Sequence, residues 1–162
     1  MKDAGALRII AHSEREVVMT RDFDAPRRLV FDALTKPELV KRWLGVRGGW
    51  SLAVCEIDLR VGGAYRYVWR KASAKIDMGM GGVFREVVAP ERIVQTELFD
   101  EPWYPGDALN TTILTEKGGR TTLTCTMRYE SEAARDAVLK TPMERGIAGS
   151  YEKLDEVLAS IG

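Results

Sequence analysis

The sequence predicts an α+β fold in which a curved antiparallel sheet wraps around one long C-terminal helix. From residue 51 onward, apolar and polar residues alternate through short segments connected by turns, which is typical of half-buried strands. Strands connected by such short turns pair antiparallel, because a parallel pair needs a crossover of about a dozen residues or more. Residues 142–161 change to a helical period with one broad apolar face. That face needs cover, and a sheet that curves around the helix is the economical arrangement.

Length and composition indicate an ordinary globular chain. At 162 residues it is long enough to bury a core, and we expect a single domain over residues 14–162 after a flexible lead-in, residues 1–13. Twenty-four basic and twenty-four acidic residues cancel, so no net charge favours a nucleic-acid partner. No apolar run approaches the ~18 residues of a membrane span, and residues 1–11 lack the apolar core of a signal peptide. We therefore expect a cytoplasmic protein with no membrane span and no nucleic-acid partner.

One strand and two short helices are predicted at the N-terminal end. Residues 14–23 alternate loosely between apolar and polar and are expected to form the first strand. Asp24 is a candidate N-cap, and Pro26 suits the first turn of a short helix. A second short helix is expected to begin at Pro37 and to end before Gly45.

Six further strands and a short helix are predicted next. The strands cover residues 51–60, 65–70, 78–88, 93–99, 109–116 and 120–129. Residues 100–107 form the longest irregular segment of the chain. Ser131 is a candidate N-cap for a short helix over residues 132–139. Together with the N-terminal strand, these segments give a seven-stranded sheet.

The long C-terminal helix has a well-marked start and two unusual glycines. Thr141 is the expected N-cap, Pro142 the first helical residue, and Glu144 stands where a capping-box partner belongs. Gly146 and Gly149 lie inside the helix, where each glycine costs about 1 kcal/mol relative to alanine. Either another group lies close against them, or a space is left open beside them.

Six motifs spread along the chain are similar to those of a known superfamily. They are Phe23-Asp24-Ala25-Pro26, Val30-Phe31, Trp43-Leu44-Gly45 and the runs from Cys55 to Gly63, from Gly82 to Val87 and from Pro90 to Val94. In combination, from about Glu14 to Leu158, they resemble the START-like (SRPBCC) helix-grip superfamily. More narrowly, they resemble the bacterial group named after the activator of the ninety-kilodalton heat-shock ATPase.

This resemblance implies a helix-grip fold: a seven-stranded antiparallel sheet that grips the C-terminal helix, with a cavity for an apolar ligand between them. It implies no common activity, so function has to be argued from the site. Two departures from the group are visible. Many relatives carry tryptophan where this chain has Ile147, and several carry histidine where it has Gly81. We expect both smaller residues to enlarge the cavity locally, and the missing histidine to remove one candidate acid or base.

The sequence gives little indication of a metal-binding site or of a nucleophilic catalytic residue. The only histidine, His12, lies in the expected lead-in, and Cys55 and Cys125 lack the spacing of zinc ligands. We interpret both cysteines as small buried hydrophobic residues, and without a partnered histidine no cysteine or serine nucleophile is indicated. We therefore expect no metal site, no cofactor and no catalytic residue of these kinds.

Two further patterns have ordinary structural interpretations. The glycine-rich segment 79–82 lacks the Lys-Ser/Thr pair of a phosphate loop, so we expect its glycines to serve close packing under the last helix. Glu56 and Asp58 lie on one face of a strand, as an acid/base pair would. That face is opposite the apolar one, so we interpret the two carboxylates as surface charges.

Aromatic and thioether side chains are the most informative functional signal. Several strands, the long loop and the last helix contribute them, and such side chains suit a ligand pocket better than a dense aliphatic core does. We predict that the ligand-binding residues are Tyr67, Trp69, Met80, Trp103, Ile147 and Tyr151, with Thr111 and Met127 in second rank.

Three functions stay open at this point. The first is the binding of a small hydrophobic or aromatic ligand in the internal cavity. The second is an enzyme, a cyclase or hydrolase of polyketide-like compounds, in which Tyr67, Tyr151 or Glu97 polarises the substrate. The third is a co-chaperone or regulatory interaction module of the heat-shock ATPase activator type, with a role in stress response. The sequence itself supports no chaperone partner, and it leaves a homodimer open.

Overall fold

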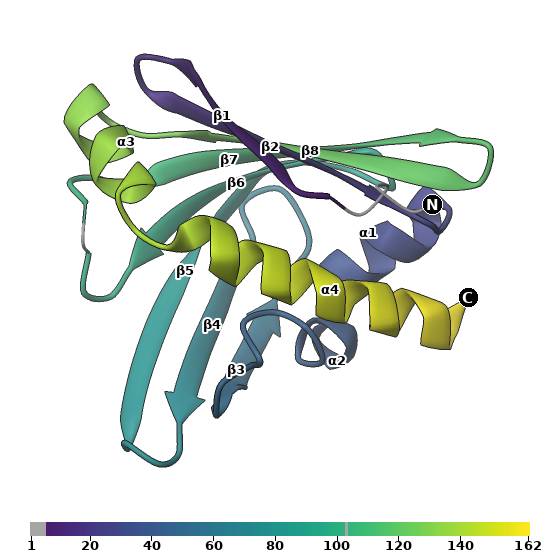
Figure 1. Ribbon diagram of the computed structural model, residues 1–162, viewed down its shortest axis with the longest axis horizontal. Coiled ribbons are helices and arrows are strands. Elements are labelled where there is room, and N and C mark those ends of the chain that lie inside the picture. Colours follow the sequence, from purple (N-terminus) through teal and green to yellow (C-terminus); the bar gives the residue numbers. More distant parts are fainter. Residues whose placement is uncertain (1–5, 103) are drawn as a thin grey trace.

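A computed structural model describes residues 6–102 and 104–162 and confirms the α+β, helix-grip class. One antiparallel sheet has the strand order β1-β2-β8-β7-β6-β5-β4-β3. It curves so strongly that α4 lies along its hollow side, as Figure 1 shows. The strands are β1 (Arg8–Ser13), β2 (Glu16–Phe23), β3 (Trp50–Ile57), β4 (Ala64–Lys71), β5 (Ile76–Val88), β6 (Arg92–Phe99), β7 (Ala108–Lys117) and β8 (Arg120–Arg128). The helices are α1 (Arg27–Thr35), α2 (Pro37–Val40), α3 (Glu132–Leu139) and α4 (Met143–Ile161).

The sheet has eight strands rather than the expected seven, because residues 8–13 are not a flexible lead-in. They form β1, which pairs antiparallel with β2 from Arg8 opposite Thr20 to Ser13 opposite Glu16. Five of the six β1 residues are exposed, so this edge strand has no buried face to generate an alternating pattern. The sequence signal for a half-buried strand is therefore missing, although the strand pairs with β2 and its Ile9 packs against the core.

Two of the expected helix caps are wrong, and one is confirmed. The N-cap of α1 is Pro26 and that of α4 is Pro142, each without a side-chain cap, so neither Asp24 nor Thr141 has the predicted role. The Thr141 hydroxyl instead donates to the carbonyl of Val138 at 2.6 Å, at the end of α3. In α3 the hydroxyl of Ser131 accepts from the backbone N–H of Ala134 at 3.1 Å, as predicted.

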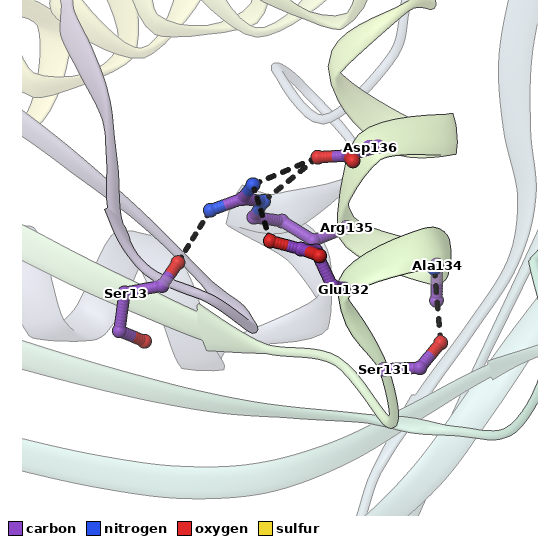
Figure 2. A network of polar contacts seen from close by, with 6 residues as sticks. All are labelled: Ser13, Ser131, Glu132, Ala134, Arg135 and Asp136. Atoms are coloured by element: carbon purple, nitrogen blue, oxygen red, sulfur yellow. Dashed lines mark hydrogen bonds and ion pairs between the residues drawn. The ribbon is translucent and has the colours of Figure 1, made fainter.

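Arg135 holds α3 against the turn between β1 and β2 (Figure 2). Its guanidinium donates to the carbonyl oxygen of Ser13 and, at 2.8 and 3.1 Å, to a carboxylate oxygen of Asp136. Glu132 lies within ion-pair distance of the same group, at 3.9 Å. The β1–β2 hairpin thus positions α3, whose Val138 is buried against the interior of the grip.

The glycines of β5 serve close packing, but not under the last helix as expected. A side chain at Gly79 would collide with the ion pair between Arg66 and Asp100, and one at Gly81 would stand 2.7 Å from the carbonyl of Tyr65. Both glycines therefore accommodate the neighbouring strand and its ion pair rather than α4.

The C-terminal half of α4 is clamped to β2. Arg21, only 3% exposed, forms two hydrogen bonds to the Asp155 carboxylate, at 2.9 and 2.7 Å. Its guanidinium carbon lies 4.6 Å from the ring centroid of Phe23 and 5.9 Å from that of Tyr151. A charge on the buried face of β2 is tolerated because α4 supplies its counter-ion.

We predict that Asp155→Ala lowers the free energy of unfolding by about 1–3 kcal/mol, because it leaves the buried Arg21 charge without a partner. The effect is smaller than the roughly 3–5 kcal/mol of a fully buried pair, since the Asp155 side chain is 45% exposed. Urea denaturation measures it. Asp77→Ala, which breaks the exposed pair between Arg70 and Asp77, is the matched control, and an equally large loss there contradicts the clamp.

Candidate ligand-binding cavity

A cavity of about 500 Å³ lies between the sheet and the N-terminal half of α4. Its walls come from strands β2 to β8, helices α3 and α4, the segment between α2 and β3 and the loop between β6 and β7. The lining residues are Met19, Trp43, Leu44, Gly45, Arg47, Trp50, Trp69, Met78, Met80, Glu97, Phe99, Tyr104, Asn110, Cys125, Met127, Tyr129, Val138, Met143, Gly146, Ile147, Ser150 and Tyr151. Most of them are aromatic, aliphatic or thioether side chains, so the lining is predominantly apolar.

The two glycines of α4 have different explanations, one for each of the alternatives that the sequence left open. No heavy atom lies within 4 Å of the position that a Cβ of Gly146 would occupy, and Gly146 lines the cavity. A Cβ of Gly149 would collide with the guanidinium of Arg47, which crosses the helix there. Open space therefore explains Gly146, and close approach explains Gly149.

The segment between α2 and β3 is fastened across one side of the cavity. The indole N–H of Trp69 donates to the carbonyl of Leu44 at 2.9 Å, and the N–H of Gly45 donates to the hydroxyl of Ser150 at 3.1 Å. Arg47 donates to the backbone carbonyl of Arg145 at 3.1 Å. The segment is thereby tied both to the sheet and to α4.

The structure brings most of the predicted ligand-binding residues to this cavity, although their contact with a ligand stays a prediction. Those that line it are Trp69, Met80, Met127, Ile147 and Tyr151. Trp103 lies outside the described residues.

Tyr67 and Thr111 are not among the lining residues. Tyr67 is 7% exposed and packs between its strand neighbours, with its ring 5.1 Å from Tyr65 and 5.8 Å from Trp69. Thr111 pairs with Thr126, whereas the preceding residue, Asn110, pairs with Met127, and successive strand residues face opposite sides.

Gly81 does not line the cavity either, so the expectation that it enlarges the cavity is wrong. It pairs with Arg66, whereas the preceding residue, Met80, pairs with Tyr67 and lines the cavity. Gly81 therefore lies on the face of the sheet that is turned away from the cavity.

A polar cluster lies inside the apolar lining. The predicted ligand-binding residues do not include it, although Glu97 is one of the groups considered for polarising a substrate. The Glu97 carboxylate accepts one hydrogen bond from the amide of Asn110 at 2.9 Å and one from the hydroxyl of Tyr104 at 3.0 Å. The Tyr104 ring lies edge-on to Tyr129, with centroids 5.2 Å apart. The Tyr129 hydroxyl has a weak acceptor, the sulfur of Met127 at 3.6 Å.

Burial dominates the protonation behaviour of this cluster. Glu97 retains some accessible surface because it lines the cavity, yet protein atoms surround its carboxyl, and this desolvation raises its pKa. The hydrogen bonds from Asn110 and Tyr104 oppose that shift in part, because they favour the charged form. Burial also raises the pKa of the Cys125 thiol to about 12, which keeps it protonated and unreactive.

The described residues, 6–102 and 104–162, contain no group of three or more histidine, cysteine, aspartate or glutamate side chains arranged to hold a metal ion. None of the helices in this part of the chain is long and apolar enough to cross a membrane.

The chain matches a family model and is similar to several solved structures. The family model described as "Activator of Hsp90 ATPase homolog 1-like protein" matches residues 24–159. A crystal structure of a Rhodobacter sphaeroides protein is 31% identical, with a TM-score of 0.89, over 95% of this chain and 98% of that one. A Chromobacterium violaceum protein is 26% identical, with a TM-score of 0.74, over 90% of this chain and 98% of that one. A Nitrosomonas europaea protein is 25% identical, with a TM-score of 0.79, over 93% of this chain and 97% of that one. No curated protein matches the sequence.

We predict that Gly146→Ala raises the free energy of unfolding by about 0.5–1 kcal/mol, since the added Cβ meets open space and alanine favours the helix. Gly149→Ala, in the next turn of the same helix, is the matched control. There the methyl group displaces Arg47 and its hydrogen bond to Arg145, so the gain is smaller or lost. Equal effects in thermal or urea unfolding contradict this difference between the two glycines.

The raised pKa of Glu97 gives a pH-dependent prediction. The native state binds this proton more tightly than the unfolded chain does, so the free energy of unfolding falls as the pH rises from the ordinary value of 4.5 through the raised value. Glu97→Gln removes this contribution. Its stability relative to the unaltered protein is therefore expected to increase from about pH 4 toward neutrality in urea titrations, and a difference that stays constant contradicts the assignment.

Proposed function

The chain belongs to the Activator of Hsp90 ATPase homolog 1-like family, and from that premise we propose that it binds a small hydrophobic or aromatic molecule in the cavity beneath α4. The observation that carries the proposal is the apolar cavity itself, at about 500 Å³. Ligand pockets range over roughly 300–1,000 Å³ and are lined mainly by hydrophobic and aromatic side chains with a few polar groups. The cavity fits this description in size and in lining.

The kinds of side chain in the lining support an adaptable binding site. Trp43, Trp50 and Trp69 offer flat apolar surfaces with a polar N–H, and two of these N–H groups are already bonded to backbone carbonyls. Five of the chain's six methionines, Met19, Met78, Met80, Met127 and Met143, line the same space. Because methionine is unbranched and polarizable, such a wall can adjust to ligands of different shape.

Ile147 and Gly146 favour an open cavity over a filled one. A tryptophan at position 147, as in many relatives of the group that the sequence resembles, would project into this space. Gly146 adds no side chain and lowers helix stability by about 1 kcal/mol relative to alanine. Ligand binding gives a reason for a helix that leaves this space open.

Enzymatic turnover is the weaker candidate. Of the three groups considered for polarising a substrate, Tyr67 is not among the cavity-lining residues, whereas Tyr151 and Glu97 line the cavity. Burial raises the pKa of the Tyr151 hydroxyl, which keeps it protonated and unsuited to act as a base. Of the three groups, Glu97 alone is placed for acid–base catalysis. The remaining lining is predominantly apolar and supports binding rather than turnover.

We predict that Ile147→Trp weakens the binding of an apolar fluorescent probe, N-phenyl-1-naphthylamine, by about tenfold or more, because the indole occupies part of the cavity. Fluorescence titration measures the affinity. Ile113→Trp adds the same indole at an exposed position of β7, away from the cavity lining, and is expected to bind the probe like the unaltered protein. If the unaltered protein fails to bind the probe, or if both variants bind it unchanged, the cavity is not the site.

A further inference from the structure

Among the described residues, Glu97 and Arg47 are the two charged side chains that line the cavity, and their surroundings differ. Arg47 is exposed and already donates to the carbonyl of Arg145. Glu97 comes from β6, and protein atoms surround its carboxyl. No basic side chain of the described part of the chain forms an ion pair with it. In its ionised form, Glu97 is therefore an acceptor without a counter-ion among the described residues.

The neighbours of Glu97 fix it in that role. The amide of Asn110 donates to one carboxylate oxygen at 2.9 Å, and the hydroxyl of Tyr104 donates to the other at 3.0 Å. An ionised carboxylate has about four acceptor positions and no donor, so two positions stay open. Because Glu97 lines the cavity, these remaining acceptor positions are available to a donor on a bound molecule.

This arrangement lowers the stability of the empty protein. A desolvated carboxylate without a cation is costly, and the side-chain amide oxygen of Asn110, Oδ1, is buried without a hydrogen-bond partner among the described residues. Well-packed apolar side chains of similar size stabilise a fold better than a partly satisfied polar network does. A purely structural role therefore does not account for the Glu97–Asn110 pair, whereas a polar contact with a ligand does.

We infer that the ligand of the cavity is an apolar or aromatic molecule that carries a hydrogen-bond donor, a hydroxyl or a protonated amine, and that Glu97 accepts this donor. The inference rests on the proposed function, since it names the chemical class of the molecule that the cavity takes. A ligand ending in a carboxylate would repel Glu97, and one without polar groups would leave the acceptor positions unpaired.

Four naphthalene probes with one ring system and different substituents test this inference. They are 2-naphthol, 2-(aminomethyl)naphthalene, 2-methylnaphthalene and 2-naphthoate, titrated by fluorescence or calorimetry against the unaltered protein and Glu97→Gln. All four probes bury the same ring, so a difference in affinity between two probes reports their substituents. A change in that difference between the unaltered protein and Glu97→Gln reports the contact of the substituent with Glu97. The hydroxyl and ammonium probes are expected to bind about tenfold tighter than the methyl probe, and naphthoate weakest of all, as for one charge-assisted hydrogen bond.

The Glu97→Gln variant distinguishes an ammonium donor from a hydroxyl donor. Glu97→Gln keeps an acceptor oxygen but loses the charge, so the ammonium probe is expected to lose its whole advantage and the hydroxyl probe only part of its own. Glu56→Gln makes the same change at an exposed position of β3 and is expected to leave all four affinities unchanged. Circular dichroism verifies that both variants are folded.

The failure of the inference differs from the failure of the proposed function. If the four probes bind the unaltered protein equally well and Glu97→Gln changes none of the affinities, the cavity binds apolar molecules but Glu97 is not the acceptor. If naphthoate binds most tightly, the polarity of the contact is reversed and the inference is overturned. If no probe binds the unaltered protein, the proposed function fails with it.

Discussion

The ion pair between Arg21 and Asp155 sets the relation of α4 to the sheet, and the cavity depends on that relation. Arg21 is buried on β2, and its two hydrogen bonds to Asp155 hold the C-terminal half of the helix at one distance from the strand. Tyr151 packs in the same place, edge-on to Phe23 with centroids 5.4 Å apart. Because a straight helix cannot follow a strongly curved sheet along its whole length, close contact at one half leaves space at the other, beside Gly146. The cavity is thus a geometric result of where the helix is fixed.

Two kinds of polar group lie inside this fold, and they have different consequences. Arg21 is paired with a carboxylate on the neighbouring helix, so its burial joins two elements. Glu97 has no such cation, and the two donors beside it, from Tyr104 and Asn110, do not neutralise its charge. The first arrangement contributes to stability, whereas the second reduces it while placing an acceptor in an apolar cavity. Such a local conflict with stability is typical of functional sites.

Periodicity in the sequence predicts the parts of the fold that have one buried and one exposed face, and it misses the rest. β2 and the apolar face of α4 are predicted because their alternation follows burial directly. β1 is missed because an exposed edge strand has no such pattern, and the caps of α1 and α4 are misplaced because Pro26 and Pro142 stand at the cap positions themselves. For the cavity, alternation identifies Trp69 and Met80, but it cannot exclude Tyr67, which shares their strand face and lies outside the lining. The polar cluster depends on an irregular loop and two strands meeting in space, which no local pattern in the sequence encodes.

The most direct test of this account is methyl NMR of the protein labelled with ¹³C at its methionine methyl groups, titrated with 2-naphthol. Five of the six methionines line the cavity, so the label reports its interior from the sheet side and from α4. We predict saturable shifts of the methyl signals of Met19, Met78, Met80, Met127 and Met143, which in Ile147→Trp require about tenfold more 2-naphthol or are lost. Binding that leaves these five signals unchanged would place the ligand elsewhere on the protein and contradict the central claim.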